Sequence, residues 1–337
     1  MNPMRLLIIA SILITPHWIP QSSGVTARLR GVSAVNEQVA FASGSGSTVL
    51  KTIDGGGTWQ KLTVTSEALD FRDIDAIDER TVYVLSIGPG PASRIYKTTD
   101  GGNSWKLQFQ NANPKAFLDA MSFWDEQHGL VFGDSVDGKF DILITENGGK
   151  LWSRIELSRL PPALANEGAF AASGTNIAMF GKTHAWIGTG AAGNARVLRT
   201  SDRGRTWAIS DTPLAAGLST GIFSIAFRDN KHGVIVGGDY TKESEAQNNL
   251  AFTSDGGATW ELGSGLRGFR SVVADVTGAK TPTLFAIGPL GTDYSTDDGK
   301  TWQPIEGPGF DTFSFVRGKR TGWAAGSQGR LAKLLLE

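Results

Sequence analysis

Three arginines in this sequence could together bind an anion. Arg30, Arg72 and Arg270 each begin or lie in a short apolar segment, and the three segments are far apart in the chain. A guanidinium group presents its N–H donors in a fork that matches a carboxylate or a phosphate. A fold that brings these segments together would therefore create a cationic cluster.

Carboxylate pairs form a second set of residues that could do chemistry. Two such side chains can cleave a glycosidic bond, one as general acid and the other as nucleophile or base. Asp119 with Glu167, or Asp134 with Asp239, could supply the pair, because all four lie in segments between predicted strands. The sequence does not fix the distance between the carboxyls of either pair.

Other kinds of site find no support in the sequence. There are no cysteines, which excludes a disulfide, a thiolate nucleophile and a thiolate-ligated metal. We expect no metal and no cofactor, because no glycine-rich phosphate or dinucleotide motif is present and the histidines do not form a metal set. His17 lies near the N-terminus, and the histidines that we expect to cap turns are His128, His184 and His232.

A motif of eight residues recurs six times and organises the chain. It reads Ser or Thr, any residue, Asp, any, Gly, any, a usually small hydroxylated residue, and Trp. Successive tryptophans are 46, 47, 55, 53 and 42 residues apart, which is typical of the blades of a β-propeller. The Asp-type and Trp positions are Asp54, Asp100, Asn147, Asp202, Asp255, Asp297, and Trp59, Trp105, Trp152, Trp207, Trp260, Trp302.

We interpret this motif as structural. Its Asp accepts hydrogen bonds from backbone N–H groups of a tight turn, its Gly takes a positive φ, and its Trp packs between neighbouring sheets. The third copy has Asn147 in place of Asp and Leu151 in place of the hydroxylated residue. We therefore expect its turn to be the least well braced.

The segments around each motif predict four short strands per repeat. First strands are predicted to begin near Arg30, Phe71, Leu118, Phe170, Phe223, Phe269 and Phe313. The fold class is thus all-β, a seven-bladed β-propeller of four-stranded antiparallel sheets. Because the seventh repeat ends without a motif, we expect an N-terminal strand, residues 25–29, to complete the last blade and close the ring.

The first 24 residues are typical of a targeting segment. Arg5 precedes an apolar run, residues 6–14, which is too short to span a bilayer, and small residues follow at positions 22–24. We expect a signal peptide, residues 1–24, cleaved near Ser23 or Gly24; a retained anchor is the alternative. Residues 25–337 would then be a secreted or periplasmic propeller with no integral membrane segment, which we expect to be a monomer.

The motif copies, with their Asp-Gly-Gly-x-Thr-Trp cores, resemble bacterial neuraminidase repeats, or Asp boxes. From about residue 25 onward the pattern resembles the photosystem II stability and assembly factor-like propellers. That resemblance implies a non-enzymatic scaffold that binds membrane-protein intermediates. Asp boxes also occur in sialidases and xyloglucan-cleaving glycosidases, so they specify a fold better than a function. A sialidase needs three arginines, a Tyr activated by Glu and an Asp acid, and among the tyrosines only Tyr240 lies in a candidate loop.

We expect the functional surface on the face opposite the boxes, where the loops are least repetitive and residues 238–249 look like a flap. The candidate ligand-binding residues are Arg30, Arg72, Asp119, Asp134, Glu167, Arg196, Asp239, Tyr240 and Arg270. The balance of 32 basic and 33 acidic residues argues against nucleic acid as a partner. We predict an extracytoplasmic, non-enzymatic binding or assembly scaffold for a protein or carbohydrate; a glycoside hydrolase, sialidase-like or of the two-carboxylate type, is the alternative.

Overall fold

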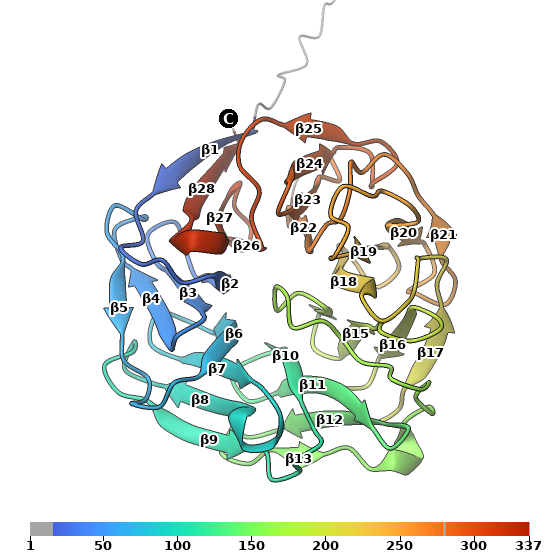
Figure 1. Cartoon of the computed structure of the whole chain (residues 1–337), viewed down its shortest axis with the longest axis horizontal. Coiled ribbons are helices and arrows are strands. Elements are labelled where there is room, and N and C mark those ends of the chain that lie inside the picture. Colours follow the sequence, from blue (N-terminus) through green and yellow to red (C-terminus); the bar gives the residue numbers. More distant parts are fainter. Residues whose placement is uncertain (1–15, 279–280, 337) are drawn as a thin grey trace, which may run out of the picture.

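The computed structural model describes residues 16–278 and 281–336, which form seven four-stranded antiparallel sheets around a central axis (Figure 1). In six sheets the chain runs in order from the innermost to the outermost strand. In the seventh, the outermost strand comes from the N-terminus. The predicted seven-bladed propeller is confirmed.

Blades 1 to 4 contain β2 (Leu29–Ala34), β3 (Ala40–Gly44), β4 (Thr48–Thr52), β5 (Gln60–Leu62); β6 (Asp70–Ala76), β7 (Val82–Ile87), β8 (Arg94–Thr98), β9 (Lys106–Gln110); β10 (Leu118–Phe123), β11 (Gly129–Val136), β12 (Lys139–Thr145), β13 (Ser153–Arg154); and β14 (Ile177–Phe180), β15 (His184–Gly188), β16 (Arg196–Thr200), β17 (Ala208–Asp211). Blades 5 to 7 contain β18 (Thr220–Phe227), β19 (Gly233–Asp239), β20 (Leu250–Thr253), β21 (Glu261–Leu262); β22 (Val272–Asp275), β23 (Leu284–Gly288), β24 (Gly291–Ser295), β25 (Gln303–Ile305); and β26 (Thr312–Phe315), β27 (Thr321–Ala325), β28 (Leu331–Leu336), β1 (Pro16–Gln21). Three short 3₁₀ helices are η1 (Gly90–Ala92), η2 (Leu157–Arg159) and η3 (Ser327–Gly329).

The N-terminus closes the ring, but through a different strand from the one predicted. β1 pairs with β28 along its whole length, from Pro16 opposite Leu336 to Gln21 opposite Leu331. The assignment of residues 25–29 to this place is wrong, since they precede β2 and Leu29 begins it. The Trp18 ring explains the choice of strand: its centroid lies 4.7 Å from that of Phe310 and 5.9 Å from that of Phe313. Residues 25–29 have no aromatic side chain to make this contact.

β1 lies within the predicted signal peptide. Cleavage near Ser23 or Gly24 would separate β1 from the propeller, so the cleavage site stays a prediction in conflict with ring closure. The apolar run, residues 6–14, lies outside the described residues. In the described part of the chain, no helix has the length and apolar character needed to cross a membrane.

Six first strands begin within three residues of their predicted starts. The start predicted near Phe170 is wrong, because β14 begins at Ile177. The preceding stretch, residues 168–176, is called the axial segment here, since its polar groups bond to the innermost parts of other blades. The Ser173 hydroxyl donates to the Ser271 carbonyl at 2.8 Å, and the Thr312 hydroxyl donates to the Ser173 carbonyl at 2.9 Å. These contacts tie the middle of the segment to blades 6 and 7, while its ends, Gly168 and Asn176, bond to blade 4.

The Asp boxes hold the turns between third and fourth strands. In the first box, Asp54 Oδ1 accepts the Thr58 N–H at 2.9 Å and Oδ2 accepts the Thr58 hydroxyl at 2.7 Å. The box glycine, Gly56, has a φ of 92°, a conformation that favours glycine. In the third box Asn147 Oδ1 accepts the Leu151 N–H at 2.9 Å, but Leu151 has no hydroxyl to donate. This turn therefore has one hydrogen bond fewer than the turn of the first box.

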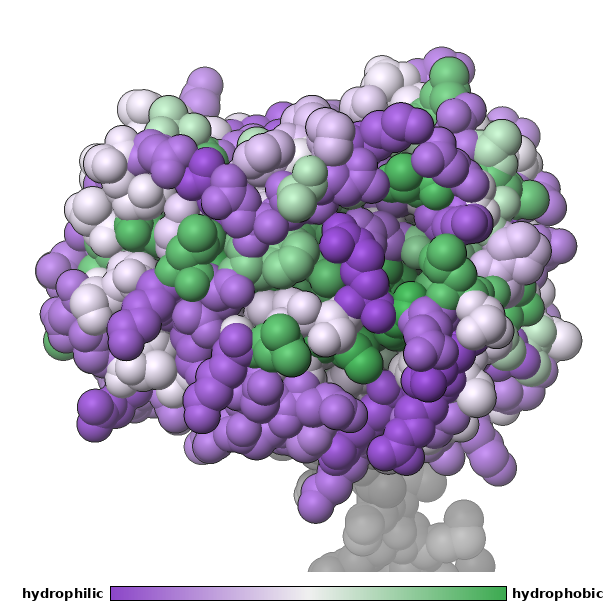
Figure 2. Space-filling view, turned by 90° about the horizontal axis from the view of Figure 1, so that it is seen from below, coloured by the Kyte–Doolittle hydropathy of each residue, from purple (hydrophilic) through white to green (hydrophobic). Residues whose placement is uncertain are grey.

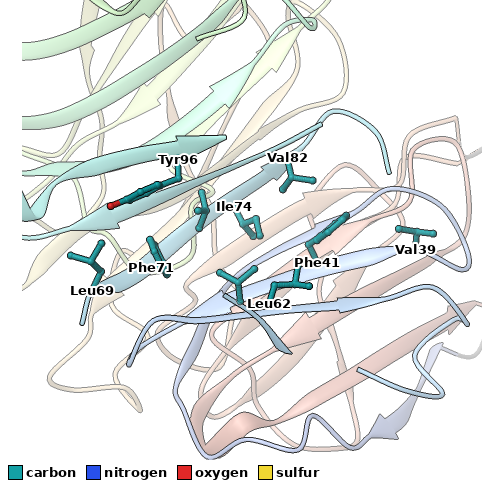
Figure 3. Packing of buried hydrophobic residues seen from close by; sticks show 10 residues of the cluster. Val39, Phe41, Leu62, Leu69, Phe71, Ile74, Val82 and Tyr96 are labelled. Atoms are coloured by element: carbon teal, nitrogen blue, oxygen red, sulfur yellow. The ribbon is translucent and has the colours of Figure 1, made fainter. Parts of the chain in front are cut away.

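Apolar side chains fill the spaces between neighbouring blades. Figure 3 shows the cluster between blades 1 and 2, where Phe41 and Leu62 of one blade lie near Phe71 and Ile74 of the next. Box tryptophans pack against such clusters, as Trp105 does against this one. On the edge of the disc that carries β9 and β13, hydrophilic residues dominate and apolar residues lie between them (Figure 2). The core is thus a ring of interblade layers.

Candidate binding site on the propeller axis

A cavity of about 580 Å³ lies on the propeller axis, on the face opposite the Asp boxes, and all seven blades contribute to its wall. Blade-to-blade connections line it, together with loops between second and third strands, such as those carrying Tyr240 and Pro289. This is the face on which the functional surface was expected from the sequence.

In four blades a β-bulge places one residue of the innermost strand in the cavity wall. The pairing of first and second strands skips one residue in each of these blades, for example between Leu29 and Gly31. A bulge re-aims the side chain of the extra residue. The four extra residues, all of which line the cavity, are Arg30, Arg72, Asp119 and Phe223.

Arg30 differs from the other two arginines of the cavity in having no carboxylate partner. Arg28 pairs with both oxygens of Asp311, at 3.0 and 2.7 Å, and Arg72 Nε lies 2.9 Å from Asp70 Oδ2. Within residues 16–278 and 281–336, Arg30 forms no ion pair, and its guanidinium donates only a 3.4 Å hydrogen bond to the Ala172 carbonyl. Burial, and then the charge of Arg72, lower the pKa of Arg30 to about 10. At neutral pH its charge is therefore present, and no carboxylate among the described residues forms an ion pair with it.

Asp119 and Asp134 lie close together in the same cavity, because the Asp134 N–H donates to the carbonyl of Phe117, two residues before Asp119, at 2.9 Å. Burial, and then the neighbouring Asp134, raise the pKa of Asp119 well above its usual range, while burial raises the pKa of Asp134 to about 6. Two neighbouring carboxyls of this kind share a proton.

Aromatic side chains of blades 5 and 6 and the axial segment form an apolar wall. Phe170 stacks on Phe223 with their centroids 4.0 Å apart, and Phe269 meets Phe223 edge-on at 4.6 Å. The half-exposed Tyr240 lies 6.1 Å from both Phe170 and Phe223. The cavity thus offers one ligand both an apolar surface and a cation, Arg30, that has no ion-pair partner among the described residues.

Four predicted ligand-binding residues lie outside this wall. Glu167 and Arg196 form a buried ion pair, with Arg196 Nε donating to Glu167 Oε1 at 2.9 Å. Arg270 is also buried, and its Nε donates to Asp293 Oδ2 at 3.0 Å. Asp239 accepts the N–H of the exposed residue two positions later at 2.9 Å, which braces a turn. The structure brings together Arg30, Arg72, Asp119, Asp134 and Tyr240.

Arg28, Glu243 and the phenylalanines of the aromatic wall were not among the residues predicted from the sequence to bind a ligand. Arg28 had been placed in the closing strand, although its spacing of two residues from Arg30 could have indicated a shared face. Glu243 belongs to the predicted flap, and its backbone carbonyl accepts the Phe269 N–H at 2.9 Å. The Glu243 side chain lines the cavity.

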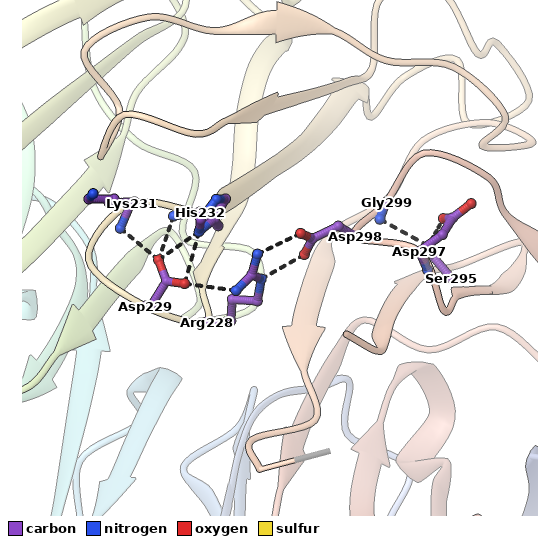
Figure 4. A network of polar contacts seen from close by, with 8 residues as sticks. All are labelled: Arg228, Asp229, Lys231, His232, Ser295, Asp297, Asp298 and Gly299. Atoms are coloured by element: carbon purple, nitrogen blue, oxygen red, sulfur yellow. Dashed lines mark hydrogen bonds and ion pairs between the residues drawn. The ribbon is translucent and has the colours of Figure 1, made fainter. Parts of the chain in front are cut away.

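Histidines on the box face belong to turn networks. His232 Nδ1 lies 2.9 Å from Asp229 Oδ2, and the adjacent Arg228 pairs with Asp298 of the next blade (Figure 4). His128 Nδ1 similarly lies 2.7 Å from Asp125 Oδ1. The described residues contain no group of three potential ligands placed to hold a metal ion.

Comparison with known proteins supports the assignment of Asp boxes. A family model described as BNR/Asp-box repeat matches residues 293–304, which include the sixth box. A search of curated proteins finds no match.

Several solved structures share the fold. YCF48 bound to D1 peptide has a TM-score of 0.67 and 19% identity, over 95% of this chain and 97% of that one. YCF48 from Cyanidioschyzon merolae has a TM-score of 0.66 and 17% identity, over 94% and 98%. The GH74 xyloglucanase from Xanthomonas campestris has a TM-score of 0.64 and 12% identity, over 94% of this chain but 53% of its own. At these identities the likeness shows the fold alone.

Proposed function

We propose that this chain is an extracytoplasmic, monomeric, non-enzymatic scaffold that binds an acidic segment of a partner polypeptide in the axial cavity. The observation that carries the proposal is the Arg30 guanidinium, which lines the cavity and lacks a carboxylate partner in the described part of the chain. Leaving a half-buried cation unpaired costs free energy, which a ligand carboxylate would recover.

The rest of the cavity suits a polypeptide better than a simple anion. The wall formed by Phe170, Phe269 and Tyr240 would contact an apolar side chain next to the acidic one. A structure of this fold is known with a peptide, since YCF48 has been solved bound to D1 peptide. That neighbour supports a protein partner without identifying it.

Binding to a defined probe tests the proposal. The probe is a fluorescein-labelled dodecapeptide of three Glu-Gly-Phe-Gly repeats, and its control has Gln in place of each Glu. We expect the wild type to prefer the acidic peptide in fluorescence anisotropy, and Arg30→Gln to weaken that binding by about tenfold or more. Arg205→Gln, an exposed change in the fourth box, is the matched control and should leave the Kd within about twofold. Equal binding of the two peptides would overturn the proposal.

A glycoside hydrolase remains the second candidate because the cavity contains Tyr240, Glu243 and three aspartates. A sialidase-type nucleophile needs Tyr activated by Glu, yet no described residue hydrogen-bonds to the Tyr240 hydroxyl. We therefore expect no turnover of aryl glycosides, a sialoside included, from acidic to neutral pH. Turnover that falls about a hundredfold in Tyr240→Phe would favour the enzyme instead.

A further inference from the structure

Asp119 and Asp134 occupy irregular positions on neighbouring strands. Asp119 is the extra residue of the bulge between β10 and β11, and Asp134 lies where the pairing of β11 with β12 shifts. At Gly168, which enters the axial segment, a Cβ atom would lie 1.8 Å from Asp134 Oδ1. The absence of a side chain there gives this carboxyl its place in the cavity wall.

The pair has hydrogen-bonding capacity that the described protein does not use. Asp119 is 1% exposed, and its buried Oδ2 has no hydrogen-bond partner among residues 16–278 and 281–336. While one proton bridges the two carboxyls, Asp119 Oδ2 is left as an acceptor without a donor. The N–H of a peptide amide matches it, because this N–H can donate to that oxygen.

We propose that the Asp119–Asp134 pair hydrogen-bonds a backbone amide of the segment that Arg30 holds, and that binding requires the pair to keep its proton. This inference rests on the proposed function. Loss of the proton adds a negative charge to a cavity that receives an acidic ligand, so affinity falls as the pH rises.

The charged surroundings of the pair do not titrate in the same way. Among the residues that the structure describes, no histidine lines the cavity. The backbone N–H of Ala169 favours the charged forms of both carboxyls, while Glu167, two residues before Ala169, is held by Arg196. The other charged groups of the cavity wall are Arg28, Arg30, Arg72, Glu243 and Asp311.

The test measures the Kd of the acidic dodecapeptide between about pH 5.5 and 8.5, a window above the titration of its Glu residues. The wild type should lose about tenfold in affinity across this window. The double variant Asp119→Asn/Asp134→Asn, which keeps an N–H donor and cannot ionise, should bind with a nearly constant Kd. Calorimetry in buffers of different ionisation enthalpy should show proton uptake on binding to the wild type at alkaline pH.

Three controls separate the possible outcomes. Arg205→Gln should keep the wild-type slope, which is the change in log Kd per pH unit. The melting temperature of each variant reports whether it is folded. If the double variant fails to fold, Asp134→Asn replaces it and should show a reduced slope. Two results would overturn this inference alone. One is peptide binding that depends on Arg30 but has the same Kd at every pH, and the other is a wild-type slope in the variants of Asp119 and Asp134. Absence of binding by the wild type at every pH would instead overturn the proposed function.

Discussion

Arg30 and Arg270 are the same residue type near the same face of the propeller, yet their environments are opposite. Arg270 is 1% exposed and donates to Asp293 and to the Phe269 carbonyl. Arg30 lies on a bulge, lines the cavity and has no carboxylate partner in the described chain. Both were predicted from the sequence to bind an anion. The ion pair between Arg270 and Asp293 forms only when β24 folds against the segment before β22, so the sequence alone does not indicate it. The type of side chain therefore predicted that arginines line the site, but not which arginines do so.

Replacing Glu243 by Gln should strengthen binding of the acidic dodecapeptide. Glu243 lines the cavity, and its charge acts on Arg28 across it. Removing that charge should lower the Kd by roughly threefold, the scale of an exposed charge pair. Fluorescence anisotropy measures the change, and Glu245→Gln, a change in an exposed residue of the same flap, is the control. A Kd that rises in Glu243→Gln would mean that Glu243 itself contacts the ligand.

Raising the pH from about 4 to 8 should destabilise the protein. Burial raises the pKa of Asp73 to about 8, whereas an Asp in an unfolded chain titrates near pH 3.9. Between these values the folded state binds more protons, so the free energy of unfolding falls by up to about 1.4 kcal/mol per pH unit for one such group. Urea titrations at several pH values measure this slope, and Asp73→Asn should reduce it. An unchanged slope would show that Asp73 is ionised throughout the window.

Asp-box carboxyls have the opposite pH dependence. The N–H and then the hydroxyl of Thr58 lower the pKa of Asp54 to about 2. The stabilisation from such a group is present above the unfolded pKa and is lost as the pH falls toward 2. The two groups of carboxyls together predict greatest stability in mildly acidic solution.

At the scale of elements, the boxes show why the fold was predictable. Each box closes its turn with contacts inside eight residues, so its sequence alone specifies the local structure. The axial segment shows the limit of this reasoning. Phe170 begins an apolar stretch like those that open other blades, but Ser173 and Thr175 bond to Ser271 and Ser224 of other blades. Those contacts exist only once the ring has formed.

Restoring the third box should stabilise blade 3. The double variant Asn147→Asp/Leu151→Thr recreates the hydroxyl-to-carboxylate bond that is 2.7 Å long in the first box. Leu151 is 63% exposed, so little packing is lost. We expect the melting temperature to rise by about 1 to 3 °C, with each single variant giving less than half of the gain. Scanning calorimetry of the three variants measures this, and additive single effects would exclude a bond between the new side chains.

At the scale of the whole molecule, ring closure was predicted from a count of strands. The seventh repeat lacked an outer strand, and an unpaired sheet edge is unfavourable, so the N-terminus had to supply one. The composition of residues 6–24 made that stretch a signal peptide and shifted the expected strand to residues 25–29. In the structure, packing of Trp18 against Phe310 and Phe313 selects β1 as the outer strand of blade 7. This contact joins residues almost a whole chain apart.

A chain that begins at residue 25 should therefore be less stable than one that begins at Pro16. It would lose the β1–β28 ladder, the Trp18 packing, and the Gln21 side chain, whose amide N–H donates to the Gly55 carbonyl of blade 1 at 3.1 Å. We expect the free energy of unfolding to fall by at least about 3 kcal/mol, the lower range for removing a large aromatic side chain. β28 would also become a free edge, so the shorter chain should associate at high concentration. Urea titration and size-exclusion chromatography of the two chains measure both effects, with Trp18→Ala as an intermediate case. Equal midpoints would show that β1 is dispensable, and a signal peptide cleaved near Ser23 or Gly24 would then be compatible with a closed, stable ring.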